Sequence, residues 1–448
     1  MRRLSSSGLG ALALGLLGAA GLASCFLPSA SIGEGSGGGS SSATSSARSS
    51  SSTGAPPPKA TPIALTLGMP AFAPMGTAMQ HHLFYGSGAW WALFPDGTTI
   101  RVRRSADFAL WTDVTTIQLG DAIDGSNLGV APVTSGAETA VHLLVRKKAD
   151  LHHYRAVLSS GGDFTLDKQG GDQLAASTEV TVIDAPVAVV AGASEEVFAF
   201  SGIGSTGGPT GDCVMCAYQS KSPDTNPGAV WSTGFGNPEE LLPTGLSPGT
   251  AKVAARGAVG LFDRPDVTAL FKLDDLAGET ILAVALPAGV GSSASTTQLT
   301  GGPSLGALGN GSWAACALEG DQSIHVVASA AKGFWHRILT PGNGTAMTPA
   351  DQPRPLPGPG SIFVACGKTH VHAFYLDTEH RDISAASFDG AQWTDWSVVV
   401  AADSTLRCGL TGHDRVVDGS VGLLWSTASV CTASSNEVDV ARVQGLAD

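Results

Sequence analysis

An internal repeat is the feature that most constrains the fold of this 448-residue chain. Residues 105–113 and 387–395 share Ser, Asp and Trp at the same offsets, and both end in Trp-Thr-Asp. A weaker copy at residues 329–335 keeps Ser and Trp but lacks Asp. Because the copies lie far apart in the chain, they predict one structural unit that is used repeatedly.

A second repeated feature is a short run of small and apolar residues that precedes a turn and a strand-like segment. It occurs seven times, at residues 72–74, 130–132, 187–192, 253–257, 313–316, 363–367 and 406–409. The spacing, roughly 40 to 65 residues, suits four-stranded propeller blades. We therefore predict an all-β fold, a single β-propeller of about seven four-stranded blades, with six blades or two β-sandwiches as alternatives.

Turn signals and alternation support an all-β fold. Pro-Asp-Gly at residues 95–97 and Asp-Gly at 389–390 are typical hairpin turns, and residues 371–376 alternate as a strand does. No helical pattern follows the first 25 residues. Small residues at the start of each unit suit the crowded innermost strand, and a closed ring hides most sheet edges.

The Ser-x-Asp-x-x-x-Trp copies resemble the Asp-box turns of sialidase-like propellers, although Ala109 and Ala391 replace the usual Gly. In that family the turn is structural: Asp accepts backbone N–H groups and Trp packs between blades. The resemblance therefore assigns a structural role to Ser105, Asp107, Trp111, Ser387, Asp389 and Trp393. Trp-Thr-Asp-Trp at residues 393–396 also resembles the Trp-x-x-Trp of sugar-binding propeller lectins.

The N-terminus predicts export and a lipid anchor. Arg2 and Arg3 precede an apolar stretch at residues 9–23, which is too short to span a bilayer and is typical of a signal peptide. Leu-Ala-Ser-Cys at residues 22–25 resembles a bacterial lipobox, and this resemblance implies that Cys25 is acylated. We expect a signal peptide at 1–24, a lipid-anchored disordered linker rich in Ser, Gly and Pro at 25–61, and the propeller at 62–448.

Charge and export together limit the partners. With a net charge of −13, the chain has no cationic stripe for nucleic acid, so nucleic acid is excluded as a partner. The lipid bilayer, reached through acylated Cys25, is the expected membrane partner. We expect the protein in the bacterial cell envelope, facing the periplasm or the cell surface.

Six cysteines remain after Cys25, an even number in an oxidising compartment, and we expect disulfides among them. They are Cys213, Cys216, Cys316, Cys366, Cys408 and Cys431. The sequence leaves their connectivity open. Cys316 and Cys366 occupy equivalent positions in adjacent units, the last unit holds Cys408 and Cys431, and the Cys213/Cys216 spacing favours a local bridge over redox catalysis.

No catalytic constellation is evident. The Arg-Ile-Pro signature of sialidases is absent, and the tyrosines that could serve as a sialidase nucleophile are Tyr85, Tyr154, Tyr218 and Tyr375. The spacing of Cys366, His370 and His372 could hold zinc only if the thiol were reduced. We expect no catalytic residues, no metal and no cofactor.

The sequence therefore favours an envelope lipoprotein whose propeller binds a glycan or a protein without catalysis. A sialidase-like glycoside hydrolase and a structural component of envelope assembly are the alternatives.

Overall fold

A computed structural model describes residues 59–65, 80–135, 138–147, 150–175, 181–182, 188–191, 197–204, 213–220, 231–233, 252–254, 266–275, 278–287, 295–298, 313–321, 323–330, 333–341, 347–351, 360–377, 381–403, 405–428 and 437–448. All of them belong to the second of two units of the chain, Pro56–Asp448. Their regular structure is β-strands and one short 3₁₀ helix, η2 (Gly125–Asn127). No helix in this part of the chain is long and apolar enough to cross a membrane.

Within the described residues the strands form seven antiparallel sheets. The first three sheets along the chain contain β2 (Leu83–Gly86), β3 (Ala89–Asp96), β4 (Thr99–Ser105) and β5 (Thr112–Gln118); β6 (Leu128–Ser135), β7 (Glu138–Lys147), β8 (Asp150–Leu158), β9 (Phe164–Leu166) and β10 (Asp172–Ala175); and β11 (Thr181–Val182), β12 (Ala188–Ala191), β13 (Val197–Gly204), β14 (Cys213–Ser220) and β15 (Trp231–Thr233).

The remaining four sheets contain β16 (Lys252–Ala254), β17 (Asp266–Asp275), β18 (Gly278–Pro287) and β19 (Ser295–Gln298); β20 (Trp313–Ala317), β21 (Ile324–Ala330), β22 (Gly333–Pro341) and β23 (Met347–Asp351); β24 (Gly360–Cys366), β25 (Val371–Asp377), β26 (Ile383–Phe388) and β27 (Ser397–Val400); and β1 (Ile63–Ala64), β28 (Leu406–Gly412), β29 (Ser420–Ala428) and β30 (Glu437–Gln444).

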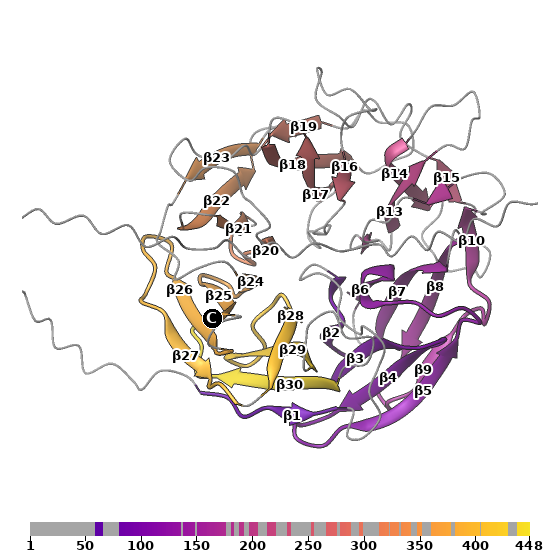
Figure 1. Cartoon of the computed structure of the whole chain (residues 1–448), viewed down its shortest axis with the longest axis horizontal. Helices are drawn as coiled ribbons and strands as arrows, with labels where there is room; N and C mark the ends of the chain where they lie inside the picture. Colours follow the sequence, from indigo (N-terminus) through magenta and orange to yellow (C-terminus); the bar gives the residue numbers. More distant parts are fainter. Residues whose placement is uncertain are drawn as a thin grey trace, which may run out of the picture. The chain divides into compact units, whose positions relative to one another are not determined.

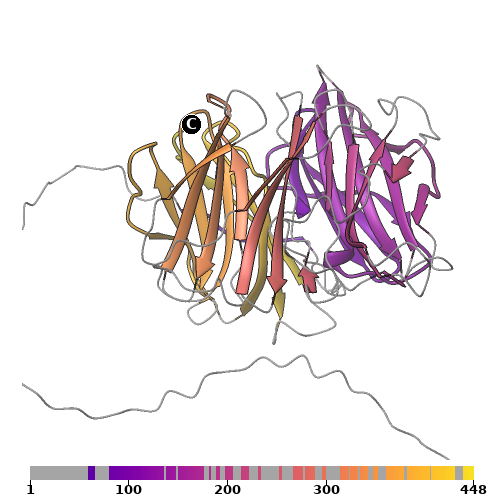
Figure 2. The same ribbon diagram turned by 90° about the horizontal axis from the view of Figure 1, so that it is seen from above.

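The sheets of this unit follow one another around a ring, as Figure 1 shows. An early strand of each sheet lies nearest the ring axis, and neighbouring innermost strands contact one another: β2 with β6, β6 with β12, β20 with β24, β24 with β28, and β28 with β2. Seen from the side in Figure 2, the strands run along the direction from which Figure 1 is viewed. The unit is a single all-β propeller.

The prediction of about seven four-stranded blades needs correction. Four continuous strands are found in five of the sheets, whereas two sheets have five strands. In each of these two, one strand position is broken in two: β9 and β10 both pair with β8, and β11 and β12 both pair with β13. Gly171, with φ of 66°, lies in the turn that separates β9 from β10, a conformation that favours glycine.

Alternation along the strands explains which side chains form the core. In β4, Ile100 and Val102 are buried, while Arg101 and Arg103 lie on the other face and form ion pairs with Asp96 and Asp113. Innermost strands instead bury both faces, as residues 362–366 of β24 do. This difference explains why the innermost strands are short runs of small and apolar residues.

The repeat turns have closely similar hydrogen bonds. Asp107 Oδ1 accepts the backbone N–H groups of Ala109 and Leu110, and Asp389 Oδ1 accepts those of the equivalent residues, Ala391 and Gln392. In the first turn Ser105 Oγ also donates to Asp107, at 3.1 Å. These bonds lower the pKa of both aspartates, so the turns retain their charged acceptors at neutral pH.

The tryptophans of these turns pack against the neighbouring sheet. Trp393 Nε1 lies 3.1 Å from Nδ1 of His336 on β22, and Trp111 packs on a cluster that includes Val438 and Val440 of β30. They therefore join adjacent sheets. Whether the turns belong to the Asp-box family stays a prediction.

Two sheets contain the same buried histidine pair. His142 Nδ1 lies 3.0 Å from His153 Nε2, and His325 Nδ1 lies 2.9 Å from His336 Nε2, with the rings stacked in both pairs. Burial lowers the pKa of His153 to about 3 and that of His325 to about 4. All four imidazoles are therefore neutral at physiological pH.

Acid should therefore unfold the propeller. Below pH 6.5 histidines are protonated in the unfolded chain, whereas the buried histidines of the folded protein stay neutral. Each such histidine therefore lowers the free energy of unfolding by about 1 to 2 kcal/mol between pH 6.5 and pH 5. Urea unfolding at a series of pH values measures this loss. His325→Gln, which removes one of these buried histidines, should flatten the curve. A pH-independent free energy of unfolding would contradict this account.

Candidate functional site

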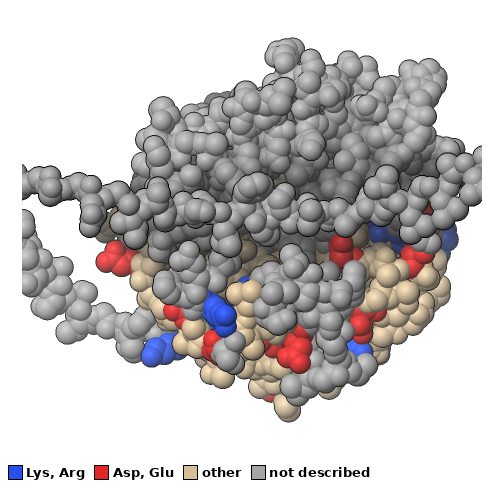
Figure 3. Space-filling model, viewed as in Figure 1, with Lys and Arg blue, Asp and Glu red and all other residues tan. Residues whose placement is uncertain are grey.

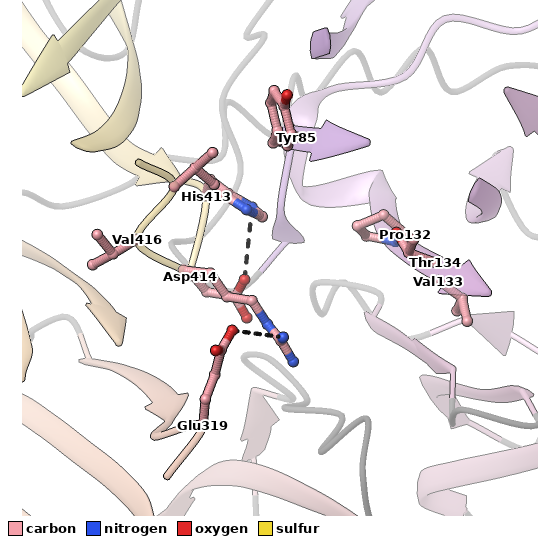
Figure 4. A pocket seen from close by; sticks show the side chains of 10 residues that line it. Tyr85, Pro132, Val133, Thr134, Glu319, His413, Asp414 and Val416 are labelled. Atoms are coloured by element: carbon pink, nitrogen blue, oxygen red, sulfur yellow. Dashed lines mark hydrogen bonds and ion pairs between the residues drawn. The ribbon is translucent and has the colours of Figure 1, made fainter. Parts of the chain in front are cut away.

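A pocket of about 330 Å³ lies at the C-terminal ends of innermost strands from several sheets. Its walls are β2 at Tyr85, β6 at residues 132–134, the turn after β20 at Glu319, and the segment after β28 at residues 413–417. We call it the axial pocket. Figure 4 shows residues 132–134 across the pocket from the side chains of Glu319, His413 and Asp414, with Tyr85 near His413.

Residues 413–417 form the wall that holds most of the charged groups. The backbone of this segment is fastened to β24: Cys366 N–H donates to the Asp414 carbonyl at 2.9 Å, and Val416 N–H donates to the Cys366 carbonyl at 3.0 Å. At the start of the segment, a Cβ on Gly412 would lie 2.4 Å from the Gly422 carbonyl oxygen. The close contact requires glycine here and fixes where the segment leaves β28.

A disulfide lies beside this wall. Cys316 on β20 is bonded to Cys366 on β24, as the equivalent positions of the two residues suggested. The bridge joins the strand that leads to Glu319 with the strand that holds residues 414–416. Glu319 N–H also donates to the Gly367 carbonyl, at 3.2 Å. The two strands therefore hold both halves of the charged wall in a fixed relation.

Two contacts between side chains, one of them an ion pair, determine the electrostatics. Arg415 Nη1 lies 3.2 Å from Glu319 Oε1, and both side chains are about one-third exposed. His413 Nδ1 lies 3.8 Å from Asp414 Oδ1 in a more buried position. Figure 4 marks both contacts. Burial lowers the pKa of His413 to about 4, so its imidazole is neutral at physiological pH.

Asp414 is kept ionised. Burial alone raises its pKa, but His81, His413 and Arg415 oppose this effect and the pKa is lowered. Among the described lining residues there are thus two carboxylates, those of Glu319 and Asp414, and one guanidinium, that of Arg415, while the His413 imidazole is neutral.

Aromatic packing shapes the other side. Tyr85 packs edge-on against Trp90, with ring centroids 5.3 Å apart, and Trp90 packs edge-on against the His413 ring at 5.7 Å. Trp90 is buried, whereas Tyr85 is only partly buried and lines the pocket. A row of three rings thus connects the aromatic wall to the charged wall.

The arrangement suits binding by hydrogen bonds. Carboxylate oxygens of Glu319 and Asp414 accept, the Arg415 guanidinium donates, and the Thr134 hydroxyl does both. An ionised Asp414 is a poor proton donor at neutral pH, while hydrolysis of a glycosidic bond needs a carboxylic acid of raised pKa. Asp439 has a pKa raised to about 6 by burial and by Glu437 and Asp403, but it lies on β30 and is not a lining residue.

The residues predicted from the sequence lie mostly elsewhere. The repeat-turn residues Ser105, Asp107, Trp111, Ser387, Asp389 and Trp393 are at hairpins between β4 and β5 and between β26 and β27, and none lines the axial pocket. Trp396 of the Trp-x-x-Trp segment packs against Tyr375, with ring centroids 6.0 Å apart.

The other cysteines are placed only in part. Cys408 is disulfide-bonded, whereas Cys25 and Cys431 lie outside the described residues, and the side chains of Cys213 and Cys216 are also not described. Because the Cys366 thiol is oxidised, it is not available as a zinc ligand with His370 and His372. His372 lies 2.7 Å from both the Ser387 hydroxyl and the Ala447 carbonyl oxygen. No group of metal ligands occurs among the described residues.

Four pocket residues were not predicted from the sequence: Glu319, His413, Asp414 and Arg415. A signal was present: each follows one of the small-residue segments predicted as innermost strands, at residues 313–316 and 406–409. Polar residues directly after innermost strands converge at one end of a propeller. The sequence suggested Tyr85 only as a sialidase nucleophile, whereas the structure places it in the lining of the axial pocket, near His413.

The side of the propeller displayed in Figure 3 has mixed charge. Acidic and basic side chains both occur on the described part of this face.

Comparisons with known proteins find solved structures of similar fold but assign the chain to no family. No family model matches the sequence, and no curated protein does. Among solved structures, SapL1 lectin in complex with alpha methyl fucoside is similar, with a TM-score of 0.42 and 13% identity over 75% of this chain and 98% of the lectin.

Two enzymes are also similar. A PL25 ulvan lyase has a TM-score of 0.49 and 8% identity over 84% of this chain and 94% of its own. A GH43_1 enzyme from Xanthomonas citri has a TM-score of 0.32 and 10% identity over 87% and 92%. Likenesses at these values assign no function to this chain.

The disulfide should contribute strongly to stability. It closes a loop between positions 50 residues apart, for which chain entropy gives about 4 kcal/mol. The double variant Cys316→Ala/Cys366→Ala should lose about that much free energy of unfolding in a urea titration. Peptide mapping of the unreduced wild type should find the two residues linked. Equal stability of the two proteins, or free thiols at both positions, would contradict the structure.

Proposed function

We propose that this protein is a lipid-anchored envelope protein whose propeller binds carbohydrate in the axial pocket without catalysis, each of the seven sheets serving as one blade. The observation on which this depends is the composition of the pocket, where the Arg415–Glu319 ion pair, the Asp414 carboxylate and Tyr85 line one cavity of about 330 Å³. Small-molecule sites range from roughly 300 to 1,000 Å³ and combine apolar walls with a few convergent polar groups.

Sugars match this composition well. Their hydroxyl groups donate to carboxylates and accept from a guanidinium, while their C–H faces pack on aromatic rings. The pocket supplies all three kinds of partner: Glu319 and Asp414, Arg415, and Tyr85. Hydrogen bonds to charged partners contribute about 1.5 to 3 kcal/mol each.

Absence of catalysis is part of the proposal. Asp414 is held ionised and Glu319 is held by Arg415, so both carboxylates serve as acceptors. A sialidase additionally needs three arginines around the substrate, and Arg415 is the one arginine among the described lining residues.

A glycan array tests the function. The full chain, solubilised in a detergent without a sugar headgroup, should bind a restricted set of glycans. Asp414→Asn should weaken the best of them at least tenfold, the equivalent of one charged hydrogen bond. Glu437→Gln, an isosteric change at an exposed carboxylate on β30, should not. Failure of every glycan to bind, or equal effects of the two variants, would contradict carbohydrate binding in this pocket.

The anchor is tested separately. Cys25 lies outside the described residues, and the proposal rests on the lipobox sequence at residues 22–25. Acyl chains contribute about 0.8 kcal/mol per buried methylene, so several chains should hold the protein on a bilayer. Cys25→Ser should move the protein to the soluble fraction, and mass spectrometry should find acyl chains on the wild type alone. A variant that stays with the membrane after a high-salt wash, with an unmodified wild type, would contradict the anchor.

A further inference from the structure

We infer that the axial pocket selects sugars by charge: it takes uncharged or amino sugars and rejects sugars that bear a carboxylate. The inference rests on the proposed carbohydrate binding and deepens it. It follows from which donors and acceptors the pocket leaves for a ligand.

The first observation is that the guanidinium of Arg415 already has a carboxylate partner. Arg415 would be the natural partner of a ligand carboxylate, but its Nη1 already lies 3.2 Å from Glu319 Oε1. An incoming carboxylate would have to displace Glu319 and then lie close to two carboxylates, those of Glu319 and Asp414. Like charges at such separations repel strongly in a partly buried site.

The second observation concerns the backbone. Anions are often bound by free main-chain N–H groups in turns, and the pocket wall is built of turns. Here the N–H groups are used internally: His413 donates to Gly422 O, Val416 to Cys366 O, Val417 to Ser420 O, and Glu319 to Gly367 O. The backbone N–H groups of these four residues are therefore not available to bind an anion.

The third observation is the neutral imidazole. His413 is buried against Trp90, and its pKa is lowered to about 4. It therefore adds no positive charge at physiological pH to offset Asp414. The pocket presents acceptors in excess, which suits ligands rich in hydroxyl or ammonium donors.

Matched sugars distinguish charge from shape. In the glucose and galactose series, the parent sugar, its 6-carboxylate (the uronic acid) and its 2-amino derivative have nearly the same ring. The full chain, in the same detergent, is titrated with the sugars of each series in a calorimeter. In the series whose parent sugar binds, the dissociation constant should be at least tenfold lower for the neutral or amino sugar than for the uronic acid. Raising NaCl from 50 to 500 mM should narrow this gap, because salt screens the repulsion.

A charge variant tests the cause. Glu319→Gln removes one carboxylate and with it the ion pair to Arg415, so it should improve uronic acid binding at least tenfold relative to the parent sugar. Glu437→Gln should leave the ratio unchanged. Uronic acid binding as tightly as the parent sugar in the wild type, or a ratio that Glu319→Gln does not move, would overturn the charge selection while leaving carbohydrate binding intact. If neither these sugars nor any arrayed glycan binds, the proposed function itself fails.

Discussion

The rest of the structure depends on ring closure by strand β1. Ile63 pairs with Val440 and Ala64 with Asp439, so the last sheet is completed by a strand from the other end of the unit. Leu65 N–H adds a bond to the Val438 carbonyl, and Ala60 N–H bonds Val399 O in the adjacent sheet. Without β1 residues 438–440 of β30 would lose their partner strand on this edge. Closure therefore both protects that edge and fixes the last sheet beside the first.

Closure also makes the pocket possible. Its walls come from β2 and β6 near the start of the propeller and from residues after β20 and β28 near its end. Only a closed ring brings these segments together. The Cys316–Cys366 bridge then holds the charged wall in place at the ring axis. Stability and function are thus linked through the innermost strands, where the sheets contact one another.

The sequence predicted the propeller well because its cues are local. Turn dipeptides, alternation and the repeated Ser-x-Asp-x-x-x-Trp segment depend on neighbouring residues, and so does the run of small residues in six of the seven innermost strands. The seventh predicted run, at residues 72–74, lies outside the described residues, and the first sheet has β2 (Leu83–Gly86) as its innermost strand instead. The breaks in two strands were not predictable, because β9, β10 and β11 are too short to show a pattern, whereas β12 lies within the small-residue run predicted at residues 187–192. Strand β1 was missed for the same reason, having two residues next to a Ser- and Pro-rich segment. The pocket joins residues more than 300 positions apart, a proximity that periodicity does not encode.

The structure of the protein with a bound sugar tests the central claim most directly. A crystal of the full chain grown with the best ligand from the array should show the sugar in the axial pocket. It should lie between Tyr85 and the carboxylates of Glu319 and Asp414, with ring closure through β1 and β30 retained. A sugar bound instead beside Trp393 and Trp396, with the axial pocket left to solvent, would contradict the account.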